Sequence, residues 1–355
     1  MTRSIPVLYY HRIGAPDPAH LSTNTEDFAR QMAFLARRGI RTLTINDVIA
    51  HISGSSPCCA PAVMITFDDG FRDNLTNAFP ILQANRQKAV LFAATGLIRP
   101  AEQTPVAVAR GFNEAHTAAR RGDFGDFLSQ NEFHTLVKSG IFEIHSHGHA
   151  HEQVFISSHV TGIYPTTDTH WGILSAYRNP LQDGVWPVFE RKPGLTQKAF
   201  RPDISRIREI MRRFPQHDLP ASTVSSALPT SAPVPALPHN WDNFLRSESD
   251  NEFRNRIRDD LVQSFELVKP FHPQGCQGFC MPWGADGPEL QAMLRETGYN
   301  AAFLTRSGAN LPGDDPFRIR RFPIKKASLA RFAFGIWLRS VPALARVYGC
   351  LHGRL

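Results

Sequence analysis

Residues 62–70 read AVMITFDDG, a run of six apolar or β-branched residues that ends at two adjacent acids and a glycine. The run predicts a buried strand that stops at Asp68 and Asp69. In parallel α/β folds the carboxyl ends of the strands face the active site. Two buried carboxylates repel each other and lose hydration, and a metal cation relieves both costs. One acid can therefore bind a metal while the other acts as a base; the alternative is a solvated loop that caps the next helix.

Short apolar runs alternate with helical spacing on both sides of this strand. Strands are expected over 7–10, 41–45, 62–67, 89–95 and 142–146, and helices over 25–38, 74–85 and 122–139. This alternation predicts βα units around a parallel sheet or barrel.

The alternation stops after residue 151. Residues 152–240 show no regular period, and 215–238 are rich in Pro, Ser and Ala, so we expect a long, irregular and partly flexible insertion over the active face. A helix is expected again over 248–268, and strands over 279–281, 301–305 and 317–324. The expected organisation is a barrel over 1–325, which contains the insertion, and a tail over 326–355.

The composition limits the class of protein. The chain has 355 residues, of which 42% are hydrophobic, and its formal net charge of +7 favours acidic partners such as anionic lipid, anionic glycan or nucleic acid. Nucleic acid is not expected, because no Arg- and Lys-rich strip with interleaved aromatic residues is present. The five cysteines form no CxxC pair, and neither a secretory leader nor a run of about 18 apolar residues is recognisable. We therefore expect a cytoplasmic protein, or one held peripherally at the inner face of a membrane.

A histidine cluster follows the fifth expected strand. Residues 143–151 read EIHSHGHAH, and His147 and His151 are four residues apart, so one helical turn would bring both rings to one side. Imidazole nitrogens and a carboxylate are suitable ligands for zinc or a similar divalent ion. Asp69, His147 and His151 would supply three ligands and leave one position open for water. The alternative is that these histidines have structural roles.

Three motifs together resemble those of the NodB-type polysaccharide deacetylases, carbohydrate esterase family 4. Residues 66–70 match the family's TFDDG motif, residues 147–151 resemble its H-[S/T]-x-x-H motif with Gly148 in place of Ser or Thr, and residues 280–284 look like its R-x-P-Y-G motif. The opening residues 7–14, VLYYHRIG, are similar to those of exopolysaccharide deacetylases of the poly-N-acetylglucosamine type.

The resemblance implies a distorted (β/α) barrel and a hydrolase that removes the N-acetyl group of an amino sugar and releases acetate. It implies that Asp68 is the catalytic base. It also implies that Asp69, His147 and His151 bind a divalent metal, with zinc as the first candidate. The substrate would be an N-acetylated polysaccharide or lipid-linked glycan, as in exopolysaccharide biosynthesis.

Two parts of the family pattern are missing. Cys280 stands where the family has an arginine that holds the catalytic aspartate, and a thiol cannot form a two-point ion pair. The leucine–histidine motif that supplies the family's general acid is not recognisable; His11 and His272 are the candidates, and either can instead be a structural or surface histidine. The missing arginine keeps open a catalytically weak barrel that only binds glycan. A deformylase of a lipid-linked formamido sugar is the other alternative.

The tail, residues 326–355, is basic and amphipathic. At about 100° per residue, Arg331, Arg339 and Arg346 fall within about 80° of one another, and apolar side chains occupy much of the remaining circumference. Pro342 is expected to kink or split the helix. Such a stretch with Trp and Phe suits a membrane interface rich in anionic lipid. The alternative is a terminal helix packed on the barrel with a solvated arginine face.

Overall fold

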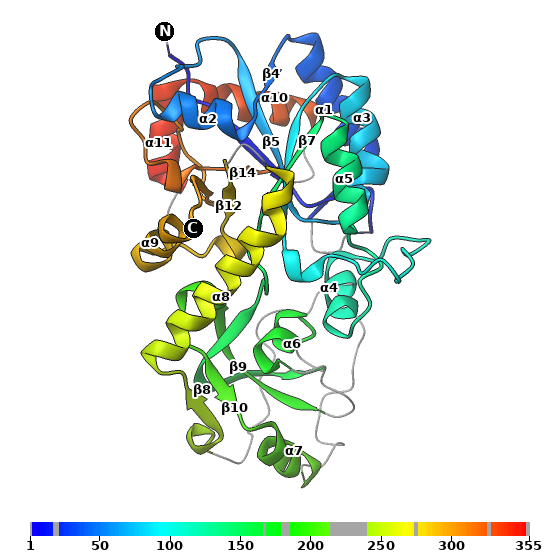
Figure 1. The fold of residues 1–355 in the computed structure, drawn as a ribbon, viewed down its shortest axis with the longest axis vertical. Helices are drawn as coiled ribbons and strands as arrows, with labels where there is room; N and C mark the ends of the chain where they lie inside the picture. Colours follow the sequence, from blue (N-terminus) through cyan, green and yellow to red (C-terminus); the bar gives the residue numbers. More distant parts are fainter. Residues whose placement is uncertain are drawn as a thin grey trace. The chain divides into compact units, whose positions relative to one another are not determined.

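Figure 1 shows the computed structural model of the protein, which describes residues 2–16, 21–165, 168–178, 185–213, 240–272, 276–324 and 328–352. The contacts within the chain divide it into two units. The barrel unit comprises Met1–Ala115, Phe124–His151 and Arg258–Leu355. The insertion unit comprises His116–Asp123 and Glu152–Ile257.

The barrel unit is built on a sheet whose hydrogen-bonded neighbours run parallel. Its strands are β1 (Val7–Tyr10), β4 (Arg41–Thr42), β5 (Ala62–Asp69), β6 (Ala89–Ala93), β7 (Phe142–Ser146), β12 (Gly278–Cys280), β13 (Ala301–Phe303) and β14 (Phe322–Pro323). They lie in the order β13-β12-β7-β6-β5-β1-β14, with β4 beside the start of β5. The sheet forms a half-barrel, which confirms the expected distorted (β/α) barrel.

The segment before β14 links the two edges of this sheet. Leu304 N–H donates to the Ile319 carbonyl at 2.8 Å, and Arg321 N–H donates to the Arg306 carbonyl at 3.1 Å. A short 3₁₀ turn, Pro316–Arg318, replaces the first part of the expected last strand. The segment thereby carries Arg321 into the interior of the unit, where only 1% of the residue is exposed.

Helices pack against the sheet, and their limits follow from local capping. Those of the barrel unit include α1 (Thr25–Arg37), α2 (Ile45–Ile52), α3 (Phe79–Ala84), α5 (Gln130–Lys138) and α9 (Pro288–Thr297), while α4 (Phe112–Arg120) and α8 (Asp250–Val268) belong in part to each unit. Ser129 and Glu132 form a capping box that begins α5. The first half of the helix expected over 122–139 is therefore absent, and 122–129 consist of turns, isolated bridges and irregular backbone.

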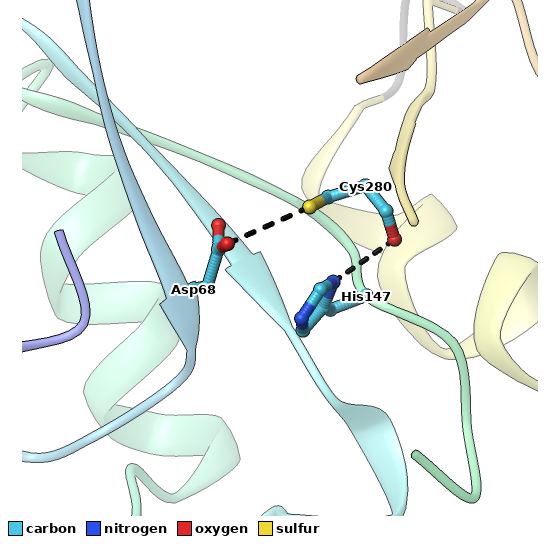
Figure 2. Close-up of side chains that lie close together, drawn as sticks. All are labelled: Asp68, His147 and Cys280. Atoms are coloured by element: carbon cyan, nitrogen blue, oxygen red, sulfur yellow. Dashed lines mark hydrogen bonds between the residues drawn. The ribbon is translucent and has the colours of Figure 1, made fainter. Parts of the chain in front are cut away.

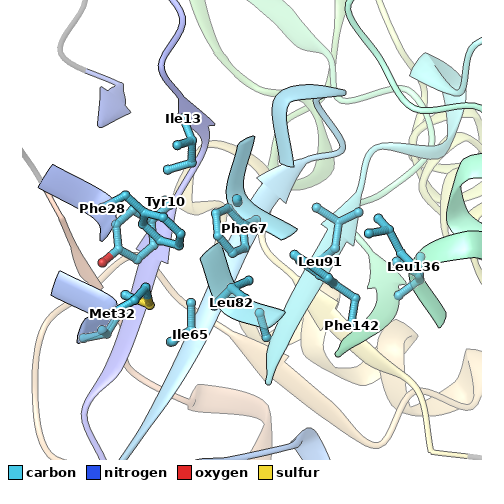
Figure 3. Packing of buried hydrophobic residues seen from close by; sticks show 14 of the residues in the cluster. Tyr10, Ile13, Phe28, Met32, Ile65, Phe67, Leu82, Leu91, Leu136 and Phe142 are labelled. Carbon is cyan, nitrogen blue, oxygen red and sulfur yellow. The ribbon is translucent and has the colours of Figure 1, made fainter. Parts of the chain in front are cut away.

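Alternation along β5 divides the core of the barrel unit into two layers. Val63, Ile65 and Phe67 pack with apolar side chains of α1, α3 and α5, as Figure 3 shows for part of this cluster. Met64 packs on the opposite side with residues of β6, β12 and β13. Because successive side chains of a strand point to opposite faces, Asp68 continues the Met64 side, into the barrel.

The insertion unit has its own strands and its own core. β8 (Gln153–Tyr164) pairs antiparallel with β9 (Trp186–Pro193), β10 (Phe200–Pro202) pairs with β11 (Leu245–Ser247), and α6 (Gly172–Tyr177) and α7 (Ile204–Arg213) complete the unit. Trp186, Phe189 and Trp241 are buried in this core. The expectation of an irregular stretch over 152–240 is therefore wrong for the described residues, because tertiary packing orders a sequence without a clear period. Residues 215–238 lie outside the described part of the chain.

Two helices end the described chain, α10 (Leu329–Ser340) and α11 (Pro342–His352), so the helix is split at Pro342 as expected. Phe332 and Ile336 of α10 join the core of the barrel unit, and the ring of Phe332 lies 6.2 Å from that of Phe34 on α1. One face of α10 is therefore packed, while Trp337 on another face is 52% exposed. Among the described residues, no helix is both long and apolar enough to span a membrane.

Candidate metal centre and catalytic site

The two acids at the end of β5 turn to different partners. Asp68 continues the inward side of the strand, whereas Asp69 has a φ of 73° and is followed by Gly70 with a φ of 92°. A positive φ is unfavourable for a residue with a side chain and persists where surrounding contacts impose it. Both carboxylates are buried. The turn thus separates two adjacent acids that would otherwise repel each other.

Three side chains form a compact group around Asp69. Its Oδ1 lies 3.5 Å from His147 Nε2 and 3.3 Å from His151 Nε2. All three residues are buried, and their ligand atoms lie within 4.8 Å of one another. Tetrahedral ligands held at about 2.0–2.2 Å from an ion are about 3.3–3.6 Å apart, so these distances fit one divalent cation such as zinc. The structure therefore brings together the three residues that the sequence predicted as metal ligands.

The two imidazoles of this group are positioned by different contacts. His147 Nδ1 donates to the Cys280 carbonyl at 2.9 Å, which leaves Nε2 facing Asp69. Burial lowers the pKa of His147, and the neutral imidazole is the form that binds a metal. His151 has a φ of 45°, and its ring centroid lies 5.2 Å from that of Trp283.

The loop between the two histidines explains the glycine at position 148. Gly148 has a φ of 76°, and a Cβ there would lie 3.0 Å from Asp260 Oδ1. Asp260 accepts hydrogen bonds from the N–H groups of His149 at 2.9 Å and Ala150 at 2.6 Å. Asp260 of α8 therefore fixes the loop that carries His151. No motif in the sequence indicated this role.

An arginine that the sequence motif lacked comes from elsewhere in the chain. Arg321 Nη1 donates to Asp68 Oδ1 at 2.7 Å, and Nη2 donates to Asp68 Oδ2 at 2.8 Å. This is the two-point geometry of strong Arg–carboxylate pairs. Burial acts to raise the pKa of Asp68, but the charge and hydrogen bonds of Arg321, together with the neighbouring histidines His147 and His11, outweigh it, so this pKa lies below its ordinary value. Asp68 is therefore an ionised carboxylate held in one orientation.

Cys280 stands at the motif position of the missing arginine and contacts the arginine that replaces it. Arg321 Nη2 donates to Cys280 Sγ at 2.8 Å, and this sulfur lies 3.7 Å from Asp68 Oδ2. Figure 2 shows Cys280 with Asp68 and His147, a second set of groups close enough to hold a cation. Burial raises the pKa of Cys280 well above its ordinary value, so the thiol stays protonated and is a poor ligand. The group around Asp69 is therefore the better metal site.

His11 lies beside the acids. It directly follows β1, and the pairing of Tyr10 with Phe67 places it level with Asp68 on the neighbouring parallel strand. Its ring meets those of Tyr9 and Phe112 edge-on, at centroid distances of 5.8 and 5.6 Å. The side chain is only partly buried, so it can reach a bound molecule.

His272 is not brought to this group. Its Nε2 forms a hydrogen bond with the Ile144 carbonyl, and its ring stacks on His145 with centroids 4.0 Å apart. Ile144 precedes the end of β7 by two residues, which is about 6.5 Å along a strand. Burial, and then the charge of His145, lower the pKa of His272 to about 4. A histidine in these contacts supports the fold, and of the two histidines singled out from the sequence it is His11 that lies level with Asp68.

Comparison with known proteins agrees with this geometry. Residues 56–218 match the family described as polysaccharide deacetylase. The chain is 36% identical over 302 residues to the poly-beta-1,6-N-acetyl-D-glucosamine N-deacetylase of Escherichia coli strain K12, which covers 83% of this chain and 32% of that protein. The chain spans about a third of the length of the curated relatives it matches.

Solved structures share the fold at low sequence identity. A de-N-acetylase from Aggregatibacter actinomycetemcomitans has a TM-score of 0.60 and 16% identity, with 93% of this chain and 99% of that chain covered. The deacetylase domain of BpsB from Bordetella bronchiseptica has a TM-score of 0.57 and 18% identity, with 90% and 96% covered. These likenesses support the fold, and the chemistry depends on the residues described above.

Proposed function

This chain carries a polysaccharide deacetylase domain of the NodB type, and from this premise we propose that it hydrolyses the N-acetyl group of an amino sugar in a glycan with the help of a divalent metal. The observation that carries the proposal is the separation of the two adjacent acids. Asp69 faces two imidazole nitrogens, whereas both oxygens of Asp68 are held by Arg321. One acid is therefore suited to metal binding and the other to proton transfer.

The proposed ligands are Asp69, His147 and His151, and zinc is the first candidate metal. A divalent cation bound there supplies Lewis-acid chemistry: it lowers the pKa of water and polarises an amide carbonyl. Asp68 takes the proton of the attacking water as general base, because it is ionised, buried and next to the ligand group. Arg321 holds Asp68 in the orientation needed for this transfer.

The second half of the reaction needs a proton for the departing nitrogen. We assign it to His11, which lies level with Asp68 and remains partly accessible. Water adds to the carbonyl carbon, the carbon–nitrogen bond breaks, and the nitrogen leaves as a free amine after it accepts a proton from His11. The products are acetate and an amino sugar.

The first substrate to test is a β-1,6-linked polymer of N-acetylglucosamine, because this is the substrate in the name of the Escherichia coli relative. A lipid-linked N-acetylated glycan is the second. The proposal predicts acetate release from a soluble β-1,6-linked oligomer by protein reconstituted with zinc, cobalt, nickel or manganese. Chelator-treated protein is the control. If the oligomer binds but no acetate forms with any of these metals, the proposed activity is wrong.

The same assay distinguishes the proposed deacetylase from two other functions, a deformylase and a barrel that only binds glycan. Formate release from a formamido sugar, with no acetate release from the acetamido sugar, would identify a deformylase. The glycan-binding alternative depended on the missing motif arginine, and the contact of Arg321 with Asp68 removes that reason.

A further inference from the structure

A pocket of about 350 Å³ lies between α11 and the segment that leads into β14, within the barrel unit. The charged side chains that line it are Arg306, Arg318, Arg320 and Arg346, together with Asp314. Four guanidinium groups around one pocket with a single lining carboxylate are suited to an anionic group such as a phosphate.

Close packing builds the base of this pocket. Ala309, Leu311 and Ala345 form a small buried apolar cluster beneath it. A Cβ on Gly349 would lie only 3.0 Å from Gly308 Cα, so the glycines allow α11 to approach the segment below it closely. The pocket is therefore part of the packed structure of the barrel unit.

Nearby carboxylates neutralise only part of the positive charge. Asp286 is shared by Arg318 at 3.2 Å and Arg306 at 3.9 Å, and Arg320 lies 3.7 Å from Asp314. Within the described ranges, no carboxylate lies within ion-pair distance of Arg346, which is exposed. The guanidinium of Arg346 is thus available to an incoming anion.

A buried arginine adds to this positive potential from behind the pocket. Arg339 Nε donates to Ser307 Oγ at 3.0 Å, and its guanidinium lies 4.0 Å from the ring centroid of Phe322 and 4.4 Å from that of Tyr348. Its guanidinium contacts a hydroxyl, the main-chain carbonyl of Gly335 and two aromatic rings. Its charge therefore contributes to attraction of an anion to the pocket.

Apolar side chains are exposed on the same pair of helices. Of the seven large apolar side chains exposed in the described part of the chain, four lie on α10 and α11: Phe334, Trp337, Val347 and Leu351. The rings of Phe334 and Trp337 lie 5.6 Å apart, and Leu351 is 73% exposed. Helices that carry both exposed apolar side chains and exposed arginines, here Arg331 and Arg346, are typical of surfaces that bind a membrane interface.

We propose that α10, α11 and the arginine pocket form a docking surface for a bilayer that contains anionic phospholipid, with a lipid phosphate seated in the pocket. A soluble anionic glycan would match the arginines but would leave Trp337 and Leu351 in water. A second copy of this chain would bring like charges together at the pocket. A bilayer satisfies both features, because its phosphates meet the arginines and its acyl boundary takes up the apolar side chains.

The test is co-sedimentation of the full chain with vesicles of phosphatidylcholine, with and without phosphatidylglycerol. The wild type should bind the anionic vesicles, bind neutral ones much more weakly, and dissociate as salt is raised. Arg346→Gln should lower partitioning about fivefold, as expected for one arginine near an anionic surface. The double change Val347→Ser with Leu351→Ser should also weaken binding.

Matched controls keep the result specific. Arg41→Gln removes an exposed arginine from β4, and Val262→Ser removes an exposed apolar side chain from α8. Neither should change vesicle binding, and all variants should keep the circular dichroism spectrum and acetate release of the wild type on a soluble oligomer.

Four results would overturn the proposal. The first is that no vesicles are bound, and the second is that neutral and anionic vesicles are bound equally. The third is that inorganic phosphate stabilises the protein although no vesicles are bound, which would indicate a site for free phosphate. The fourth is that no vesicles are bound and the wild type forms a dimer that the Val347→Ser, Leu351→Ser variant does not form.

Discussion

Two regions of the barrel unit contribute to one site by different means. The first is the end of β5 together with the loop after β7, and the second is the region between β12 and β14. Asp69, His147 and His151 come from two short motifs whose spacing is visible in the sequence. The arginine that holds Asp68 lies 41 residues after the cysteine at the motif position. A ligand pair within one loop depends on local spacing, whereas any segment that enters the barrel can supply a cation to its centre. Motif searches therefore detect the first arrangement and miss the second.

The largest expected effect concerns the acid that does not bind the metal. Asp68→Asn keeps the size of the side chain but removes the base, so we expect acetate release to fall about 10²–10⁴-fold. The measurement is the initial rate with saturating metal. Wild-type activity in this variant would assign the base to another residue.

The next effect tests whether Arg321 replaces the motif arginine. Arg321→Ser leaves the buried Asp68 carboxylate without its partner, so we expect a fall of about 3–5 kcal/mol in the free energy of unfolding and a large loss of activity. The double variant Cys280→Arg, Arg321→Ser restores a guanidinium from the motif position.

We expect this double variant to exceed Arg321→Ser in both stability and acetate release. Cys280→Arg alone is the control, and it should be destabilised because two guanidinium groups then compete for one buried position. A double variant no better than the single one would show that the two positions are not equivalent.

A third comparison separates the two histidines proposed from sequence. His11→Asn should reduce acetate release about 10²-fold or more, because it removes the proposed proton donor. His272→Gln keeps a donor for the Ile144 carbonyl and should retain most of the activity. The reverse order of effects would exchange the two roles.

The smallest effect is a pH dependence of stability due to His272. Its pKa is about 4 in the folded protein, against about 6.5 in an unfolded chain. Between these values only the unfolded state binds the proton, so the free energy of unfolding should fall as pH drops from about 6.5 to about 4, by on the order of 2 kcal/mol.

Denaturant unfolding of wild type and His272→Gln at several pH values measures this effect. The variant should lose less stability than the wild type over the acidic range. His159→Gln, which changes an exposed histidine, should follow the wild type. If the His272→Gln and wild-type curves are parallel, His272 does not contribute to the pH dependence.

Sequence patterns predicted the parts of the structure that depend on neighbouring residues. The strand ending at Asp68 and Asp69, the helix over 25–38 and the split at Pro342 follow from apolar periodicity, local turn chemistry and the geometry of proline. The capping box of Ser129 with Glu132 is also local, and attention to it would have placed the start of α5 correctly.

Contacts between distant residues were beyond such reasoning. Asp260 holds the loop of His151 from α8, and Arg321 reaches Asp68 because main-chain bonds with β13 direct its segment inward. The core of the insertion unit is ordered by packing among Trp186, Phe189 and Trp241. A single sequence contains these residues but does not show which of them meet.

The separation of roles between Asp68 and Asp69 is tested most directly by metal content. Elemental analysis would be carried out on wild type, Asp68→Asn and Asp69→Asn after reconstitution with zinc and removal of free metal. We expect about one zinc per chain in the wild type and in Asp68→Asn, and little in Asp69→Asn. Equal retention or equal loss of zinc in the two variants would contradict the assignment of one acid to the metal and the other to the proton.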